Sequence, residues 1–312
     1  MGRKQLVLGV DGGGTKSIGL IADEDGNILA RREVGATNPN VVGFDTSAKH
    51  IVDLILSVCE DVRCNPDEVR SIVLGLAGAG AESDRNRLLD EVHTLFAGLV
   101  EKKLPITIET DARVALEGAF NGGHGVVVIA GTGSIVIGKT QRGEVVTVGG
   151  WGRIVGDEGS GYYIGREALA AIALHMDKRG EATRVKDVVA RTFGWETREQ
   201  LIAAVYHENF DIASLAPVIF EAAAAYDVVS QRILQKAATL LADQASVIVK
   251  QMGILRKVGM VMCGSLIDHE TVYANVLHMK ILKVLPQVDI RPAVHSPAHG
   301  AVLLALALLK RN

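Results

Sequence analysis

The chain has 312 residues, of which 48% are hydrophobic and 22% charged, a balance typical of a globular protein and not of a disordered or fibrous chain. Its formal net charge of −3 gives no electrostatic case for binding nucleic acid or an anionic membrane. Three cysteines are too few for a disulfide framework. We identify no signal peptide and no apolar stretch long enough to cross a bilayer. These features predict a cytoplasmic protein with no nucleic-acid or membrane partner.

The first part of the chain predicts an α/β unit. Its expected elements, in chain order, are strands at 5–10, 17–22 and 28–34, a helix at 46–62, a strand at 71–77, a helix at 84–96, a strand at 104–109 and a helix from 111. Asp, Gly and Asn residues at 23–27 favour a hairpin turn between the second and third strands, because these residue types tolerate positive φ.

The same order of elements recurs in the second part. The expected elements are strands at 125–130, 134–139 and 144–148, a broken helical region at 158–251, a strand at 258–263, a helix at 269–278, a strand at 281–290 and a helix at 297–309. The repetition indicates an internal duplication. We therefore expect one lobe at 1–115, completed by the C-terminal helix 297–312, and a second at 116–296 with a helical insertion at 158–251.

Each half opens with a glycine-rich turn between two expected strands. The two turns are Asp11-Gly12-Gly13-Gly14-Thr15-Lys16 and Gly131-Thr132-Gly133-Ser134. Glycine allows backbone N–H groups to face a ligand, and the hydroxyls add donors for phosphate oxygens. One such turn is equally well explained as a tight hairpin, but two at matching places favour phosphate binding. Lys16 precedes a strand and not a helix, which excludes a Walker loop.

Further short segments extend the pattern beyond the turns. They are Ala36-Thr37-Asn38, Thr110-Asp111-Ala112, Gly149-Gly150-Trp151-Gly152 and Gly156-Asp157-Glu158-Gly159-Ser160. With them, nearly the whole chain resembles the BadF/BadG-type group of the superfamily of sugar kinases, actin and heat-shock chaperone ATPases, and within it the N-acetylglucosamine kinases. The resemblance implies two ribonuclease-H-like lobes, a duplicated actin-like ATPase fold, with an interlobe cleft. Proteins of that family commonly form homodimers, so the resemblance also implies a possible homodimer.

The resemblance also implies an activity, the ATP-dependent phosphorylation of N-acetylglucosamine to its 6-phosphate, with Asp111 as the base. Taken alone, Asp111 after a strand is equally well explained as a helix N-cap. Asp11 is expected to hold Mg²⁺, through water, because Mg²⁺ keeps much of its hydration. Pro39-Asn40 follows Asn38 where mammalian members carry an aromatic residue, so glucosamine, N-acetylmuramic acid or another hexose remain open as substrates.

By the same resemblance, sugar contacts are expected from Asn38, Asp111, Gly150, Trp151 and Asp157. Nucleotide contacts are expected from the two glycine turns and from Ala213, Gly264 and Ser265. The residues alone allow a plainer interpretation, in which Trp151 is buried in a loop and Asp157 caps the next helix.

Two functions of other classes fit the sequence less well. An ATPase activator would need clustered thiolates for an iron–sulfur cluster, but Cys59 and Cys64 fall on or just past a helix and Cys263 is distant. A non-catalytic sugar-sensing regulator is expected to carry a DNA-binding helix-turn-helix before the first strand, which this sequence does not have. His295 and His299 are four residues apart, but Pro297 lies between them and no third zinc ligand is evident.

Overall fold

The computed structural model describes residues 5–208, 210–253 and 257–310. Their packing divides the chain into two compact units. One contains the residues up to His124 together with those from Pro292 onward, and the other is Gly125–Arg291. The C-terminal segment thus returns to the unit in which the chain begins.

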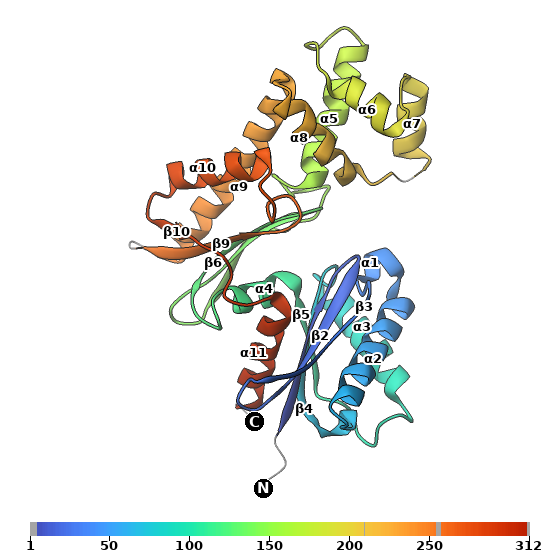
Figure 1. Cartoon of the computed structure of the whole chain (residues 1–312), viewed down its shortest axis with the longest axis vertical. Coiled ribbons are helices and arrows are strands. Elements are labelled where there is room, and N and C mark those ends of the chain that lie inside the picture. Colours follow the sequence, from blue (N-terminus) through green and yellow to red (C-terminus); the bar gives the residue numbers. More distant parts are fainter. Residues whose placement is uncertain (1–4, 209, 254–256, 311–312) are drawn as a thin grey trace. The chain divides into compact units, whose positions relative to one another are not determined.

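The first unit is a five-stranded mixed sheet covered by helices on both faces (Figure 1). Its elements are β1 (Leu6–Gly12), β2 (Lys16–Asp23), β3 (Ile28–Gly35), α1 (Pro39–Val42), α2 (Phe44–Asp61), the 3₁₀ helix η1 (Pro66–Glu68), β4 (Val69–Leu76), α3 (Glu82–Phe96), β5 (Ile106–Thr110), α4 (Asp111–Ala119) and α11 (Pro297–Leu309). The strand order is β3-β2-β1-β4-β5. Strands β1 to β3 form an antiparallel meander, while β4 runs parallel to β1 and β5 parallel to β4.

Two apolar layers enclose this sheet, because its central strands carry buried apolar side chains on both faces. Helices α2 and α3 cover one face, and α11, which packs on α4, covers the other (Figure 1). Gly9 and Gly300 permit the close packing of α11 on β1 and on α4. A Cβ at Gly9 would collide with the backbone of α11, and one at Gly300 with the backbone of α4. Helix α11 therefore lies directly on β1 and holds the strand that ends in the first glycine turn.

The second unit is built on another five-stranded sheet. Its elements are β6 (Gly125–Ala130), β7 (Ser134–Lys139), β8 (Val145–Gly149), α5 (Gly161–Met176), α6 (Val185–Phe193), α7 (Arg198–Tyr206), the 3₁₀ helix η2 (Ile212–Leu215), α8 (Ala216–Ala224), α9 (Val228–Gln251), β9 (Val258–Cys263), α10 (Val272–Val284) and β10 (Val288–Ile290). The strand order, from the meander edge, is β8-β7-β6-β9-β10.

The two sheets have the same topology, since β6 to β10 occupy the positions of β1 to β5 in the first sheet. The directions also match, since β6 to β8 are antiparallel neighbours and β9 runs parallel to β6 and to β10. The predicted α/β fold with an internal duplication is therefore confirmed. Three of the predicted strands, at 125–130, 134–139 and 258–263, coincide with β6, β7 and β9.

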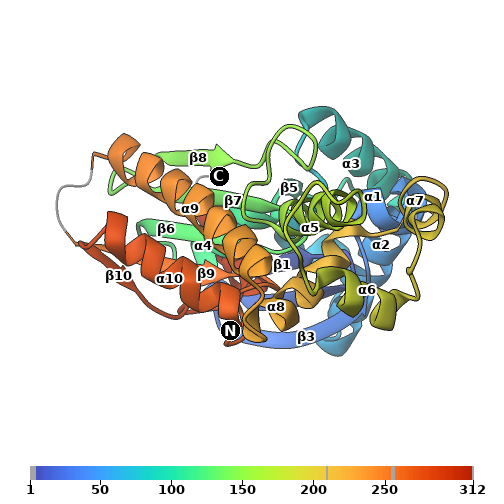
Figure 2. The same ribbon diagram turned by 90° about the horizontal axis from the view of Figure 1, so that it is seen from above.

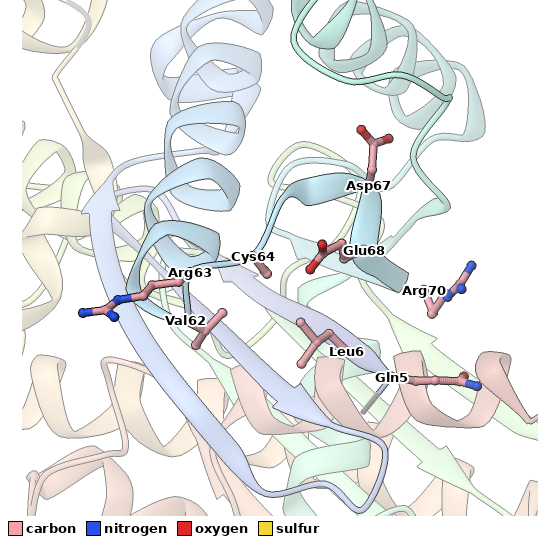
Figure 3. A pocket seen from close by; sticks show the side chains of 8 residues that line it. All are labelled: Gln5, Leu6, Val62, Arg63, Cys64, Asp67, Glu68 and Arg70. Carbon is pink, nitrogen blue, oxygen red and sulfur yellow. The ribbon is translucent and has the colours of Figure 1, made fainter. Parts of the chain in front are cut away.

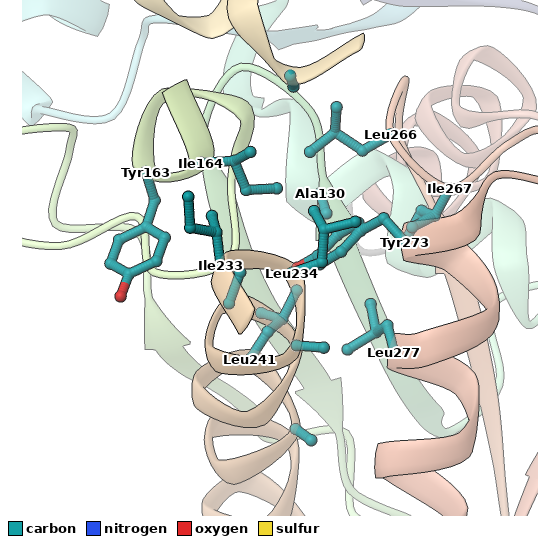
Figure 4. Close-up of a cluster of buried hydrophobic side chains, with 14 of the residues drawn as sticks. Ala130, Tyr163, Ile164, Ile233, Leu234, Leu241, Leu266, Ile267, Tyr273 and Leu277 are labelled. Carbon is teal, nitrogen blue, oxygen red and sulfur yellow. The ribbon is translucent and has the colours of Figure 1, made fainter. Parts of the chain in front are cut away.

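Helices α9 and α10 run side by side over the second sheet (Figure 2). Between them and the strands lies an apolar core that includes Leu234, Leu241 and Leu277 (Figure 4). Tyr273 of α10 is fully buried there, and its hydroxyl donates a 2.6 Å hydrogen bond to the Gly159 carbonyl. This bond ties α10 to the segment between β8 and α5.

The strand expected at 281–290 is wrong over most of its length. Helix α10 continues to Val284, with Tyr273, Leu277 and Ile281 buried at a spacing of four, and only Val288–Ile290 forms a strand. The apolar run before Pro286 fits either structure, and the helical spacing of its buried residues decides it. Among the described residues, no helix is long and apolar enough to span a membrane.

Candidate functional site

In the first unit, the glycine turn links β1 to β2 and is tied to the segment that follows β3. The turn closes with a 3.1 Å hydrogen bond from the Gly13 N–H to the Lys16 carbonyl. The Gly13 carbonyl accepts the N–H groups of Thr37 and Asn38 at 3.1 and 3.2 Å. Gly12 ends β1, Gly14 and Thr15 form an exposed tip, and the Lys16 side chain lies 3.9 Å from Glu33. The tip is thus free to meet a ligand while its base is fixed.

Asn38 is held between this turn and the segment after β4. Its Oδ1 accepts the Asn40 N–H at 2.9 Å and so caps the short helix α1. Gly78, at φ +79°, lies so close that a Cβ there would overlap the same Oδ1. The Asn38 Nδ2 lies 3.9 Å from the position of a Cβ at Gly14. The amide therefore points its donor toward the glycine turn. None of the sequence motifs includes Gly78, although its place just after an expected strand is a usable signal.

Two carboxylates lie at the carboxyl edge of the same sheet. Asp11 is near the end of β1, and Asp111 directly follows β5 as the first residue of α4. The N-cap of α4 is Thr110, whose Oγ1 accepts the Arg113 N–H at 3.2 Å, so the interpretation of Asp111 as an N-cap is wrong. Asp111 Oδ1 instead accepts the N–H of Ala112 at 2.8 Å.

The surroundings of these carboxylates make their charged forms unfavourable. Burial, and to a lesser extent the Asp111 carboxylate, raise the pKa of Asp11 to about 6, against a lowering by Lys16. The Asp111 side chain reaches solvent, yet protein atoms crowd its carboxyl, and this loss of water raises its pKa against the lowering by backbone N–H groups. Because Asp111 acts on the pKa of Asp11, the two groups interact electrostatically.

The donor set fits a magnesium ion. In the described part of the chain no group of three His, Cys, Asp or Glu side chains is arranged to hold a metal. Mg²⁺ however keeps several waters and is commonly bound through one or two carboxylates together with substrate phosphates. A divalent cation beside Asp11 and Asp111 would favour the charged form of both, which burial opposes.

The second glycine turn, between β6 and β7, rests on the start of α5. The Gly131 N–H donates to the Gly133 carbonyl at 2.9 Å, and the N–H groups of Gly161 and Tyr162 donate to the Gly131 and Thr132 carbonyls at 2.8 and 3.2 Å. Thr132 is thereby held at the tip of the turn.

The other nucleotide residues predicted in this unit gather at the same turn. Ser265 Oγ lies 3.4 Å from the position of a Cβ at Gly131, and the Ala213 Cβ lies 3.3 Å from that at Gly161. A Cβ at Gly264, which has φ +113°, would collide with the Ala130 backbone. The structure thus brings together residues separated by up to about 130 positions in the sequence.

Asp157 lies beside this second turn and is 8% exposed. Its Oδ2 is 3.0 Å from the position of a Cβ at Gly133, and it accepts backbone hydrogen bonds from Ser134 and Gly152. Burial nevertheless raises its pKa. Helix α5 begins later, with Ser160 as its N-cap, so the interpretation of Asp157 as a helix cap is wrong. Its backbone has φ +60°, which is unusual for a residue with a side chain.

Trp151 lies at the tip of the segment between β8 and α5, and it is exposed. Its side chain is 77% accessible, and those of Ile154 and Val155 are 85% and 76% accessible, so the expectation of a buried Trp is wrong. Gly150, at φ +72°, packs so closely on Ile135 that a Cβ would lie 2.7 Å from it. The base of the segment is fixed, while its apolar tip projects into solvent.

A cavity of about 380 Å³ lies elsewhere in the first unit, at the start of β1 (Figure 3). It is lined by Gln5, Leu6, Val62, Arg63, Cys64, Asp67, Glu68 and Arg70. About five residues of extended strand, roughly 17 Å, separate Leu6 from Asp11. This cavity is therefore not part of the carboxylate and glycine-turn site, which is a surface feature of its unit.

Several proteins that this chain resembles are sugar kinases. The chain is 32% identical to an N-acetyl-D-glucosamine kinase of Dictyostelium discoideum, over 97% of this chain and 98% of that protein. It is 33% identical to an N-acetylmuramic acid/N-acetylglucosamine kinase of Clostridium acetobutylicum, over 96% and 98% of the two chains. A ROK family glucokinase from Streptomyces griseus, solved with glucose and AMPPNP, shares the fold with a TM-score of 0.57 and 17% identity, over 98% of this chain and 100% of that one.

The family itself follows from a match that spans both units. The model of the BadF/BadG/BcrA/BcrD ATPase family matches residues 8–305, which include both glycine turns, Asp111 and the 149–160 segment. The chain belongs to the BadF/BadG/BcrA/BcrD ATPase family.

Proposed function

We propose that this chain is an ATP-dependent sugar kinase, which transfers the γ-phosphoryl group of ATP to the 6-hydroxyl of N-acetylglucosamine. Relatives that match almost the whole chain at 32% and 33% identity are kinases of this sugar. The observation that carries the proposal is the pair of interacting carboxylates, Asp11 and Asp111, at the sheet edge that also bears the first glycine turn.

Asp111 is the base in this reaction. Its carboxylate takes the proton of the 6-hydroxyl as that oxygen bonds to the γ-phosphorus, and the bond from the γ-phosphorus to the bridging oxygen breaks to release ADP. The raised pKa of Asp111 makes it a better proton acceptor than an ordinary surface aspartate. Since the transition state is loose, the main requirement on the protein is to position the hydroxyl and to neutralise charge.

The two glycine turns serve as phosphate-binding elements. Gly12, Gly13, Gly14, Thr15 and Lys16 form this element in the first unit, and Gly131, Thr132, Gly133 and Ser134 form it in the second. The exposed tips at Gly14 and Thr15 and at Thr132 offer donors to phosphate oxygens. Mg²⁺ held by Asp11, in part through water, would neutralise phosphate charge. Ala213, Gly264 and Ser265, gathered around the second turn, form the nucleotide side of the site.

Each unit carries candidate sugar-binding residues. Asn38 directs its Nδ2 toward the first turn, where it can donate to a sugar oxygen, while the Asp157 carboxylate can accept from a pair of sugar hydroxyls. The exposed Trp151, with Gly150 beside it, offers an apolar face for the ring. Glucosamine and N-acetylmuramic acid are the alternative substrates, because the acyl group has no dedicated partner among these residues.

The test is an ADP-release assay with Mg-ATP over a panel of amino sugars and hexoses, for the wild type, Asp111→Asn and Asp53→Asn. Asp53 is exposed on α2, so its variant makes the same chemical change away from the site. We expect release to depend on N-acetylglucosamine, to fall at least about 1,000-fold in Asp111→Asn, and to be unchanged in Asp53→Asn. No sugar-dependent release in the wild type, or full activity in Asp111→Asn, would refute the proposal.

A further inference from the structure

We propose that Gln244 on α9 is a positioning residue for the sugar site, acting through Glu158 to hold Asp157 in place. The proposal rests on the proposed function, since it assigns the purpose of this contact to sugar binding. All of the residues involved belong to the second unit, and Gln244 lies 86 positions from Glu158 in the sequence.

The contact itself is specific. Gln244 Nε2 donates a 2.9 Å hydrogen bond to Glu158 Oε2. The Gln244 Oε1 lies 2.5 Å from the position of a Cβ at Gly149, so residue 149 must be glycine for the amide to fit. Helix α9 thus contacts both the start and the later part of the 149–160 segment.

The amide oxygen of Gln244 is otherwise unsatisfied. Within the described residues, Oε1 is buried and has no hydrogen-bond partner. A buried polar atom without a partner is destabilising, and most native side chains avoid it. An apolar residue at 244 would avoid that penalty. The glutamine is therefore explained by the hydrogen bond that its Nε2 donates to the Glu158 carboxylate.

The segment needs such support at Asp157, the one non-glycine residue among its five positions with positive φ. Gly149, Gly150, Gly152, Asp157 and Gly159 all have positive φ between +60° and +85°. For Asp157 this conformation is unfavourable, and it persists only where neighbouring contacts impose it.

Three contacts converge next to Asp157. Ser134 Oγ donates to the Glu158 carbonyl at 2.9 Å, the Tyr273 hydroxyl donates to the Gly159 carbonyl at 2.6 Å, and Gln244 holds the Glu158 carboxylate. Of these three contacts, only that of Gln244 joins two side chains, since the other two end on backbone carbonyls. It therefore fixes which way Glu158, and with it the neighbouring Asp157, faces relative to the second glycine turn.

The decisive experiment measures steady-state kinetics of Gln244→Met, which keeps the length of the side chain and removes the donor. We expect the KM for the sugar to rise about tenfold, with the KM for ATP and the thermal midpoint close to wild type. Glu158→Gln keeps an acceptor oxygen and should stay within about twofold of wild type. Adding Glu158→Leu to Gln244→Met should cause little further loss, because the two residues act as one unit.

Gln235→Met is the matched control, since Gln235 is exposed on the same helix. A Gln244→Met enzyme with wild-type sugar KM would overturn the inference, as would a parallel rise of both KM values with a lowered thermal midpoint. Should the wild type phosphorylate no sugar, the proposed function fails. Acrylamide quenching of Trp151 in a Trp195→Phe background then tests the contact alone. Quenching altered by Gln244→Met and not by Gln235→Met supports it, and unaltered quenching refutes it.

Discussion

Replacing Asp11 by Asn is expected to stabilise the folded chain at pH 8 while removing most of its activity. The ordinary pKa of an aspartate is 3.8, and burial together with Asp111 raises that of Asp11 to about 6. At 1.36 kcal/mol for each pH unit between the two values, the charged folded form is destabilised by about 3 kcal/mol. Since Asp11 is only partly shielded from water, a gain of about 1 to 3 kcal/mol is expected from its neutral replacement.

The sign of the pH dependence follows from the raised pKa. Well below pH 3.8 the carboxyl is protonated in both the folded and the unfolded chain, so wild type and Asp11→Asn should be equally stable. As the pH rises from about 4 to 6, the unfolded chain loses its proton first and the wild type loses stability relative to the variant. The full difference is expected at pH 7 to 8, as a rise of the thermal midpoint by roughly 2 to 5 °C.

Thermal unfolding of both proteins at pH 3 and pH 8, with and without MgCl₂, measures this. Mg²⁺ should raise the midpoint of the wild type at pH 8 and leave Asp11→Asn unchanged, because the carboxylate that holds the ion is gone. The kcat/KM of Asp11→Asn should fall by about 100-fold or more. A variant that is less stable than wild type at pH 8, or equally responsive to Mg²⁺, would contradict both the charge and the metal assignment of Asp11.

Two further results are expected. Gly78→Ala should raise the sugar KM at least about tenfold and lower the free energy of unfolding by about 1 to 3 kcal/mol, because the added Cβ would displace Asn38. Gly80→Ala, which has open space around it, should behave as wild type. Equal kinetics of the two variants would exclude Asn38 from the site. Activity should fall about tenfold between pH 7.5 and pH 5, since Asp111 must be unprotonated to act as a base and Asp11 titrates near pH 6; a rate independent of pH over this range would contradict the assignment.

Most of the fold could be predicted from the sequence because its signals are local. Strands β1, β6 and β9 are buried on both faces and so read as continuous apolar runs between glycines or polar residues. The strand predicted at 281–290 is wrong because it, too, is inferred from a local apolar run. An apolar run with β-branched residues fits a strand or a helix face, and the choice depends on packing against α9, which no short window contains.

The candidate site, too, could be predicted where its signals are local and not where they join distant residues. The glycine turns and Asp111 stand out because each is a short pattern at a predicted strand end. The contacts that fix the site do not, because they join distant positions. Gly78 limits Asn38 from 40 positions away, and Gln244 reaches Glu158 across 86. Nothing near residue 244 marks it, since a glutamine on a long helix is ordinarily a solvated residue.

The duplication explains how the two turns came to be fixed in the same way. Ser17 and Ser134 are equivalent, since they pair with Gly12 and Ala130, the last residues of β1 and β6. Both serines are buried, and both reach the segment that follows the third strand of their sheet. Ser17 Oγ lies 2.8 Å from the hydroxyl of Thr37, and Ser134 Oγ donates to the Glu158 carbonyl at 2.9 Å.

In each unit the residue next to that partner is a candidate sugar ligand, Asn38 after Thr37 and Asp157 before Glu158. A buried hydroxyl thus connects the glycine turn of each unit to the segment that carries its candidate sugar ligand, with a different partner in each case. The difference between the units lies in the chemistry added to this shared frame. The first carries Asp11, whose counterpart in β6 is Ile129, and the second carries the apolar tip at Trp151. We therefore assign the metal and the base to the first unit, and the enclosure of the sugar to the second.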